Sequence, residues 1–144
     1  MESAPSPLLD LPWDIHEAMV RHCLGEAPLE CCGILGGVFP EVSLFYPLAN
    51  DQQSETRYNA DPRDLIAAVR DLREREAEIL AIYHSHPRWE AVPSQADLRL
   101  NYYGAIPRII VSLLEPEPSV RIWRLDPDSY QELGWRLGDR NASP

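Results

Sequence analysis

The chain has 144 residues, of which 44% are hydrophobic and 25% charged, a length and composition typical of one globular domain with a sizeable core. The net charge is −10, with 23 acidic against 13 basic residues, which argues against a nucleic-acid-binding protein because phosphate neutralisation needs clustered Lys and Arg. No apolar run is long enough to span a membrane, and the first residues lack the basic and apolar regions of a secretory signal.

The three cysteines bear on the redox compartment. Their count is odd and two of them are adjacent, at Cys23, Cys31 and Cys32. A disulfide framework is therefore not expected, and a reducing cytoplasm is favoured. A thiolate metal site at Cys31 and Cys32 is the alternative, but the C-x2-C spacing of such sites is missing.

The first half of the chain predicts two helices separated by two strands. The helices are expected over 12–25 and 61–76, and the strands, as a hairpin or as neighbours, over 31–39 and 42–48. Met19 and Cys23 fall on one face of the first helix, and Asp61 followed by Pro62 is typical of a helix start. Residues 1–9 are expected to be loose, and 50–59 to form a loop.

The second half predicts a buried strand, a short helix and a second strand pair. The near-continuous apolar run over 78–84 is typical of a central strand that is covered on both faces. A helix over 94–103 and strands over 108–114 and 120–125 follow, with a short further element after residue 126. We expect a single domain over residues 1–137 and a disordered tail over 138–144.

One motif carries most of the chemistry. The segment from His84 to Asp97 reads H-S-H-P-x6-S-x2-D. An extended backbone places the imidazoles of His84 and His86 on one side, and Pro87 favours that backbone for His86. Two neutral imidazoles and one carboxylate leave a bound zinc ion with net positive charge and room for water, the pattern of catalytic sites. The sequence therefore predicts a metal-dependent hydrolase.

The motif resembles the signature of the JAMM (MPN-plus) metallopeptidases at every position. A second segment, P-x-E-x-C-G-x-L-x-G, begins at Pro28 and contains Glu30, and weaker similarity extends the resemblance over roughly residues 13–125. The resemblance implies that His84, His86 and Asp97 bind one zinc ion per chain. It implies that Glu30 is the general base and that Ser94 stabilises the oxyanion. Ser94 and Asp97 also fit a helix capping box, which is compatible with both roles.

The resemblance further implies an α/β fold of the cytidine-deaminase-like type, with a curved mixed β-sheet flanked by helices. The compact chain is similar to the prokaryotic members of the family. Those members cleave the amide bond after the C-terminal Gly-Gly of a ubiquitin-like β-grasp sulfur-carrier protein, from either a carrier–cysteine or a carrier–lysine adduct. An extended tail of that kind is expected to pair along a strand edge. The sequence leaves the leaving group and the oligomeric state open.

Three alternatives stay open or are disfavoured. A non-catalytic MPN-type scaffold would lack zinc, and a zinc peptidase of broader specificity would share the same site. A zinc deaminase would need H-x-E and P-C-x-x-C, neither of which occurs.

Other residues near the motif have less specific roles. Trp89 and Glu90 are expected to rim the substrate cleft, whereas Arg57 and Tyr58 either bind substrate or cover a loop. His16 and His22 are expected to be structural or exposed, and Trp13, Trp123 and Trp135 to be packing residues.

Overall fold

A computed structural model describes residues 7–56, 58–99, 101 and 104–141 of the chain. Its elements, in chain order, are β1 (Pro7–Leu11), α1 (Trp13–Glu26), β2 (Cys32–Val38), β3 (Glu41–Leu48), α2 (Pro62–Glu74), β4 (Glu78–His86), α3 (Gln95–Arg99), β5 (Arg108–Ser112), β6 (Ser119–Leu125) and β7 (Tyr130–Leu137).

The strands form one mixed sheet that curves until it closes. Their order is β1-β3-β2-β4-β5-β6-β7, and the ring closes because β1 pairs with both β3 and β7. The pairing of β1 with β3 is limited to Asp10 opposite Glu41. The pairs that β1 makes, and the β4–β5 pair, are parallel, while the others are antiparallel. The predicted curved, mixed α/β sheet is confirmed.

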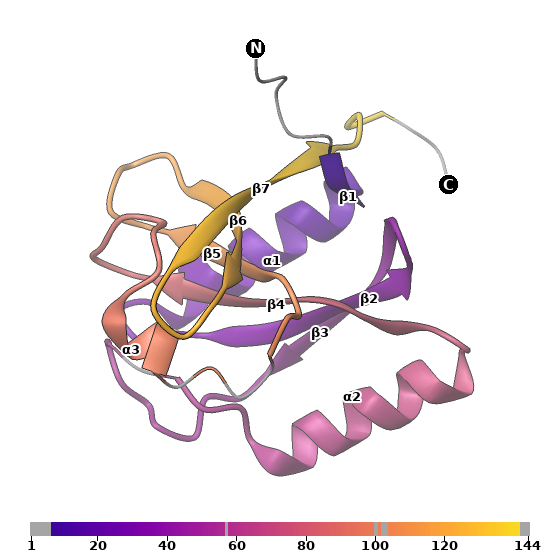
Figure 1. Cartoon of the computed structure of the whole chain (residues 1–144), viewed down its shortest axis with the longest axis horizontal. Coiled ribbons are helices and arrows are strands. Elements are labelled where there is room, and N and C mark those ends of the chain that lie inside the picture. Colours follow the sequence, from indigo (N-terminus) through magenta and orange to yellow (C-terminus); the bar gives the residue numbers. More distant parts are fainter. Residues whose placement is uncertain (1–6, 57, 100, 102–103, 142–144) are drawn as a thin grey trace.

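The two long helices cover opposite faces of the sheet. Figure 1 shows α1 on the concave side and α2 along the outer side. In β4, successive side chains alternate between these faces. Ala81 and Tyr83 join the core cluster that includes Met19 of α1, whereas Ile82 joins the cluster that includes Leu72 of α2. This two-sided burial explains why β4 is almost continuously apolar, as the sequence predicted.

The N-terminal prediction was wrong for residues 7–9, which are expected to be loose but belong to β1. Leu9 and Leu11 are almost fully buried, and β1 runs parallel to β7 at the other end of the chain. The local sequence of a five-residue strand cannot indicate that its pairing partner, β7, lies more than a hundred residues away in the chain. The element expected after residue 126 is the eight-residue β7.

Two further boundaries differ from the prediction. Strand β4 extends to His86, so both histidines of the motif lie within the strand and not in the loop after it. Helix α3 ends at Arg99, before the expected residue 103, and residues 100, 102 and 103 lie outside the described part of the chain. Gly138, the first residue of the expected disordered tail, donates a backbone hydrogen bond to Leu11 (2.8 Å), and residues 142–144 are not described.

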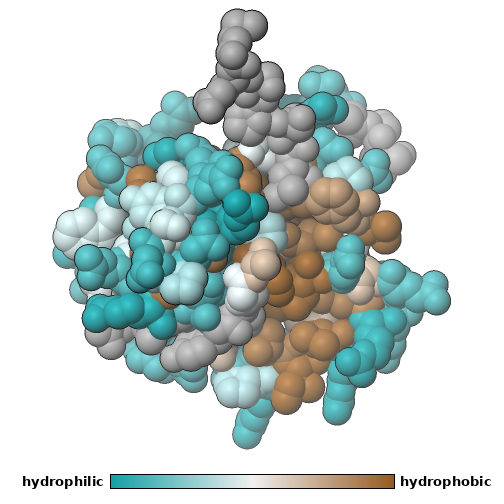
Figure 2. Space-filling view, in the orientation of Figure 1, coloured by the Kyte–Doolittle hydropathy of each residue, from teal (hydrophilic) through white to brown (hydrophobic). Residues whose placement is uncertain are grey.

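The surface is uneven in its polarity. On the face seen in Figure 2, hydrophilic residues cover the side where α3 lies, and a hydrophobic area lies right of the centre, with further hydrophilic residues at the right edge. Within the described ranges, none of the helices combines the length and the apolar character needed to cross a bilayer.

Candidate metal centre and catalytic cleft

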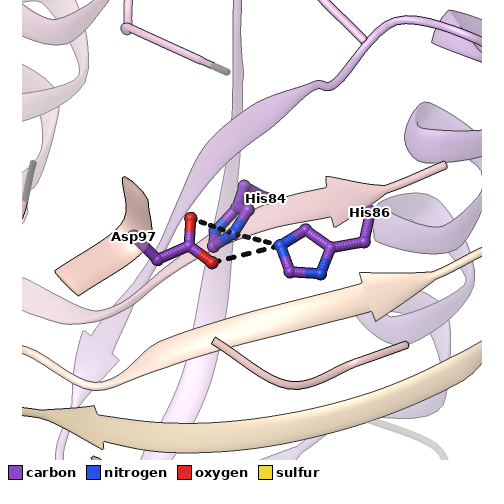
Figure 3. A group of neighbouring side chains, drawn as sticks. All are labelled: His84, His86 and Asp97. Carbon is purple, nitrogen blue, oxygen red and sulfur yellow. Dashed lines mark hydrogen bonds and ion pairs between the residues drawn. The ribbon is translucent and has the colours of Figure 1, made fainter. Parts of the chain in front are cut away.

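Three of the predicted site residues meet at one point (Figure 3). His84 and His86 project from the same side of β4, and Asp97 faces them from α3. The two carboxylate oxygens of Asp97 lie 3.1 Å from the Nε2 atoms of His84 and His86, and the two Nε2 atoms are 3.2 Å apart. All three side chains are buried. The structure thus brings together the set that the sequence singled out as metal ligands.

The donor atoms fit a divalent cation. One ligand atom from each residue lies within 4.8 Å of the other two, a separation that one ion can bridge. His86 Nδ1 is 2.8 Å from the carbonyl oxygen of Glu90. Since a carbonyl only accepts, Nδ1 carries the proton and Nε2 presents its lone pair to the site. Two imidazole nitrogens with one carboxylate are suited to zinc.

Asp97 is held as an anion by the start of its own helix. The backbone N–H of Ser94 donates to Asp97 Oδ2 (2.8 Å), and the N–H of Asp97 donates to Ser94 Oγ (3.0 Å). The predicted capping box is therefore formed. Burial alone raises the pKa of Asp97, but the facing His84 and His86 outweigh it and bring that pKa well below its usual range. A carboxylate that stays ionised is what a metal ligand requires.

Glu30 lies just before β2, beside this group. Its residue is 3% exposed, and within the described ranges its Oε1 atom has no hydrogen-bond partner. Burial, reinforced by the charge of Asp97, raises the pKa of Glu30 to about 9. Without a nearby cation this carboxyl group is therefore neutral at physiological pH. The side chain of Asn50 donates to the Glu30 carbonyl oxygen (2.9 Å) and holds this part of the backbone.

A cleft of about 780 Å³ is lined by one of the candidate ligands, His86, and by the two other predicted site residues, Glu30 and Ser94. Its lining residues are Glu30, Thr56, His86, Arg88, Trp89, Glu90, Val92, Ser94, Ala96 and Leu114. Trp89 and Glu90 thus lie at the cleft, as predicted. Ser94 Oγ accepts a hydrogen bond from Asp97, so its own O–H can still donate. Arg88 pairs with Glu55 (3.0 Å), and both side chains are exposed.

Sequence reasoning missed a buried support behind the site. The ring of Tyr58 stacks on His84, with 4.5 Å between centroids, and Arg108 is 1% exposed and donates to the Tyr58 hydroxyl (2.7 Å). Tyr58 therefore packs on a predicted ligand and is more than a loop cover, whereas Arg57 lies outside the described residues. The sequence does contain one indication of this support: Arg108 begins the apolar strand β5. A charged residue in a buried strand is costly unless it has polar partners.

The cysteines do not form a metal site of their own. The Cys31 and Cys23 sulfur atoms are 3.3 Å apart in the core cluster on the α1 side, whereas Cys32 packs in the cluster on the α2 side. The candidate ligand group found among the described residues contains no cysteine. His22 is half-buried, and its Nδ1 lies 2.6 Å from the Tyr83 hydroxyl, in agreement with a structural role.

Relatives with assigned activities match most of the chain. The "Probable TtuB-protein conjugate cleaving protease" of Thermus thermophilus is 40% identical over 93 residues, which are 64% of this chain and 62% of that protein. The "CysO-cysteine peptidase" of Mycobacterium tuberculosis is 33% identical over 107 residues, 72% of each chain. The "Desampylase" of Haloferax volcanii is 24% identical over 89% of this chain and 95% of its own.

Solved structures agree in fold. A protein from Desulfitobacterium hafniense superimposes with a TM-score of 0.84 at 33% identity, covering 92% of this chain and 94% of its own. A JAB1/MPN domain protein from Archaeoglobus fulgidus gives a TM-score of 0.60 at 14% identity, covering 92% of this chain and 99% of its own, which supports the fold alone.

The family described as prokaryotic homologs of the JAB domain matches residues 12–126. This match contains Glu30, Ser94 and the three candidate ligands, together with every element from α1 to β6. The chain belongs to the prokaryotic JAB domain family.

Proposed function

We propose that the protein is a zinc-dependent peptidase that hydrolyses the amide bond after the C-terminal Gly-Gly of a ubiquitin-like sulfur-carrier protein. The observation that carries the proposal is the convergence of His84, His86 and Asp97 beside a cleft that is lined by His86, Glu30 and Ser94. The names of the relatives, which describe proteases acting on TtuB conjugates and on CysO-cysteine, support the substrate class.

We assign His84, His86 and Asp97 as the ligands of one zinc ion per chain. When bound, zinc supplies a Lewis acid that activates water and polarises a carbonyl group. The residues contribute two neutral nitrogens from β4 and one anionic oxygen from α3. His86 is oriented by Glu90 and Asp97 by Ser94, so these two ligands are held in place by hydrogen bonds before the ion binds.

Glu30 is assigned as the general base. A buried carboxyl group with a raised pKa accepts a proton readily once a nearby cation has favoured its ionised form. Glu30 takes the proton of the attacking water and delivers it to the leaving amine. The Ser94 hydroxyl donates to the oxyanion, a type of contact whose removal costs about 3–4 kcal/mol in a known hydrolase.

A flexible tail without side chains suits the cleft. The apolar side chains of Trp89, Val92 and Leu114 line it together with Glu30 and Ser94, so an extended chain in the cleft would contact both the apolar and the catalytic groups. Glycine offers no side chain to clash there.

We also propose a reducing, cytoplasmic location, which is supported by three cysteines that form no disulfide. We further propose a single domain over residues 1–137.

The test compares carrier–cysteine and carrier–lysine adducts, each with its natural tail and with the penultimate glycine changed to leucine. We expect release of a carrier ending in Gly-Gly from at least one natural adduct, detected by its intact mass. We expect a rate at least about tenfold lower with leucine, because a buried clash of this size costs more than about 1.4 kcal/mol.

Equal rates on glycine and leucine tails would contradict a glycine-selective cleft. Cleavage of unrelated peptides with no cleavage of any adduct would instead assign a zinc peptidase of broader specificity. Zinc-free protein that binds carriers without cleaving them would assign the non-catalytic scaffold.

A further inference from the structure

The two histidines of the candidate metal centre are held in different ways. His86 is oriented by a hydrogen bond from Nδ1 to the Glu90 carbonyl oxygen (2.8 Å). His84 is completely buried, and in the described part of the chain its Nδ1 has no hydrogen-bond partner. A metal-binding histidine is ordinarily fixed through its second ring nitrogen. His84 must therefore be oriented by something other than a polar contact at that atom.

Tyr58 supplies the contact that His84 otherwise lacks. Its ring lies nearly parallel to the His84 imidazole, with the centroids 4.5 Å apart and the planes at 21°. Stacking of this kind fixes the plane of a ring without using either ring nitrogen. It leaves Nε2 of His84 directed at Asp97, at 3.1 Å from Oδ1. The stacking thus restricts rotation of the His84 ring, which would turn this nitrogen out of the site.

Arg108 in turn anchors Tyr58. It is the first residue of β5 and pairs with Ile82 of β4, two residues before His84. Its Nη1 donates to the Tyr58 hydroxyl (2.7 Å), and its Nη2 donates to the Asn101 side-chain oxygen. Burial of a guanidinium group is costly unless its hydrogen bonds are used. The arginine therefore ties the loop that carries Tyr58 to the strand next to the histidines.

We propose that Tyr58, anchored by Arg108, is a positioning residue for the metal centre: its ring holds the His84 imidazole in the ligating orientation and so sets zinc affinity. The inference rests on the proposed zinc site and adds to it a residue outside the H-S-H-P-x6-S-x2-D motif. A residue that only covered the loop would protect the fold and leave metal affinity unchanged.

The test measures zinc affinity by competition with a chelator, and the absorption bands of the cobalt(II)-substituted protein, for wild type and three variants. Tyr58→Leu removes the ring, and we expect zinc affinity to fall about tenfold or more, the range seen when groups behind metal ligands are lost. Tyr58→Phe keeps the ring and loses only the hydrogen bond from Arg108, so its zinc affinity should fall less than that of Tyr58→Leu. The cobalt bands should change for leucine and be restored with phenylalanine.

Tyr46→Leu is the matched control. Tyr46 lies on β3, and its hydroxyl donates to Asp71 of α2 (2.6 Å), so the variant loses a comparable tyrosine away from the histidines. It should bind zinc as wild type does. Should Tyr58→Leu not fold, Tyr58→Met keeps a flexible apolar side chain at the same place, and the same loss is expected.

Wild-type zinc affinity and cobalt bands in Tyr58→Leu or Tyr58→Met would overturn the inference and leave the proposed function intact. A loss in Tyr58→Phe as large as in Tyr58→Leu would also overturn it, because the ring alone would then not suffice. Failure of the wild-type protein to bind zinc would overturn the proposed function together with the inference.

Discussion

Changing His86 to alanine is expected to remove bound zinc and with it all hydrolysis above background. The variant deletes one of three donor atoms that lie within 4.8 Å of one another. Loss of a group that merely supports a ligand already costs about 10–100-fold in affinity, so loss of the ligand should cost more than about 100-fold. Metal analysis of protein purified without chelator, together with an adduct-cleavage assay, measures both effects.

His22→Ala is the control for this variant. His22 is half-buried on α1 and contacts Tyr83, on the face of β4 opposite the candidate ligands. It should retain its zinc, although the lost hydrogen bond lowers stability by roughly 1 kcal/mol. Retention of stoichiometric zinc by His86→Ala would contradict the ligand assignment.

Glu30→Gln is expected to keep zinc and lose turnover by about 10²–10⁴-fold, the usual contribution of a general base. The amide has the shape of the carboxylic acid but cannot accept the proton. Zinc content should stay at the wild-type value because Glu30 is not one of the three converging ligands. Loss of zinc from this variant would make Glu30 a ligand, and a wild-type rate would place the base elsewhere.

The stability of the metal-free Glu30→Gln variant separates lost catalysis from lost folding. Burial raises the pKa of Glu30 from 4.5 to about 9, so the metal-free native state binds a proton there that the unfolded chain releases. The stability contributed by this group is complete below about pH 4.5 and declines as the pH rises toward about 9. Since glutamine does not titrate, metal-free Glu30→Gln should unfold at a temperature no lower than wild type at about pH 8.

The sequence predicts much of this site because the residues that make it are close together in the chain or carry strong local signals. His84 and His86 lie two residues apart on one strand and so share a face, and the Ser94–Asp97 pair, which begins eight residues further on, caps a helix. Glu30 is different, because only the family resemblance links it to the motif. Its burial beside Asp97 results from the antiparallel pairing of β2 with β4.

The parts that the sequence did not predict depend on contacts between distant residues. The strand β1 exists because Leu9 and Leu11 are buried where β7 provides a parallel partner, a pairing that no local periodicity contains. Tyr58 and Arg108 are fifty residues apart, and they meet only because β5 lies beside β4. Propensity and spacing cannot indicate that a tyrosine in a polar loop stacks on a histidine.

The central claim is that this cleft hydrolyses an amide bond by means of one zinc ion, and a titration tests it most directly. Protein stripped by a chelator is mixed with increasing zinc, and the initial rate of carrier release is measured at each ratio. We predict no release without zinc, a linear rise, and a break at one zinc per chain. Full activity in the stripped protein, or the absence of activity at any zinc ratio, would contradict the account.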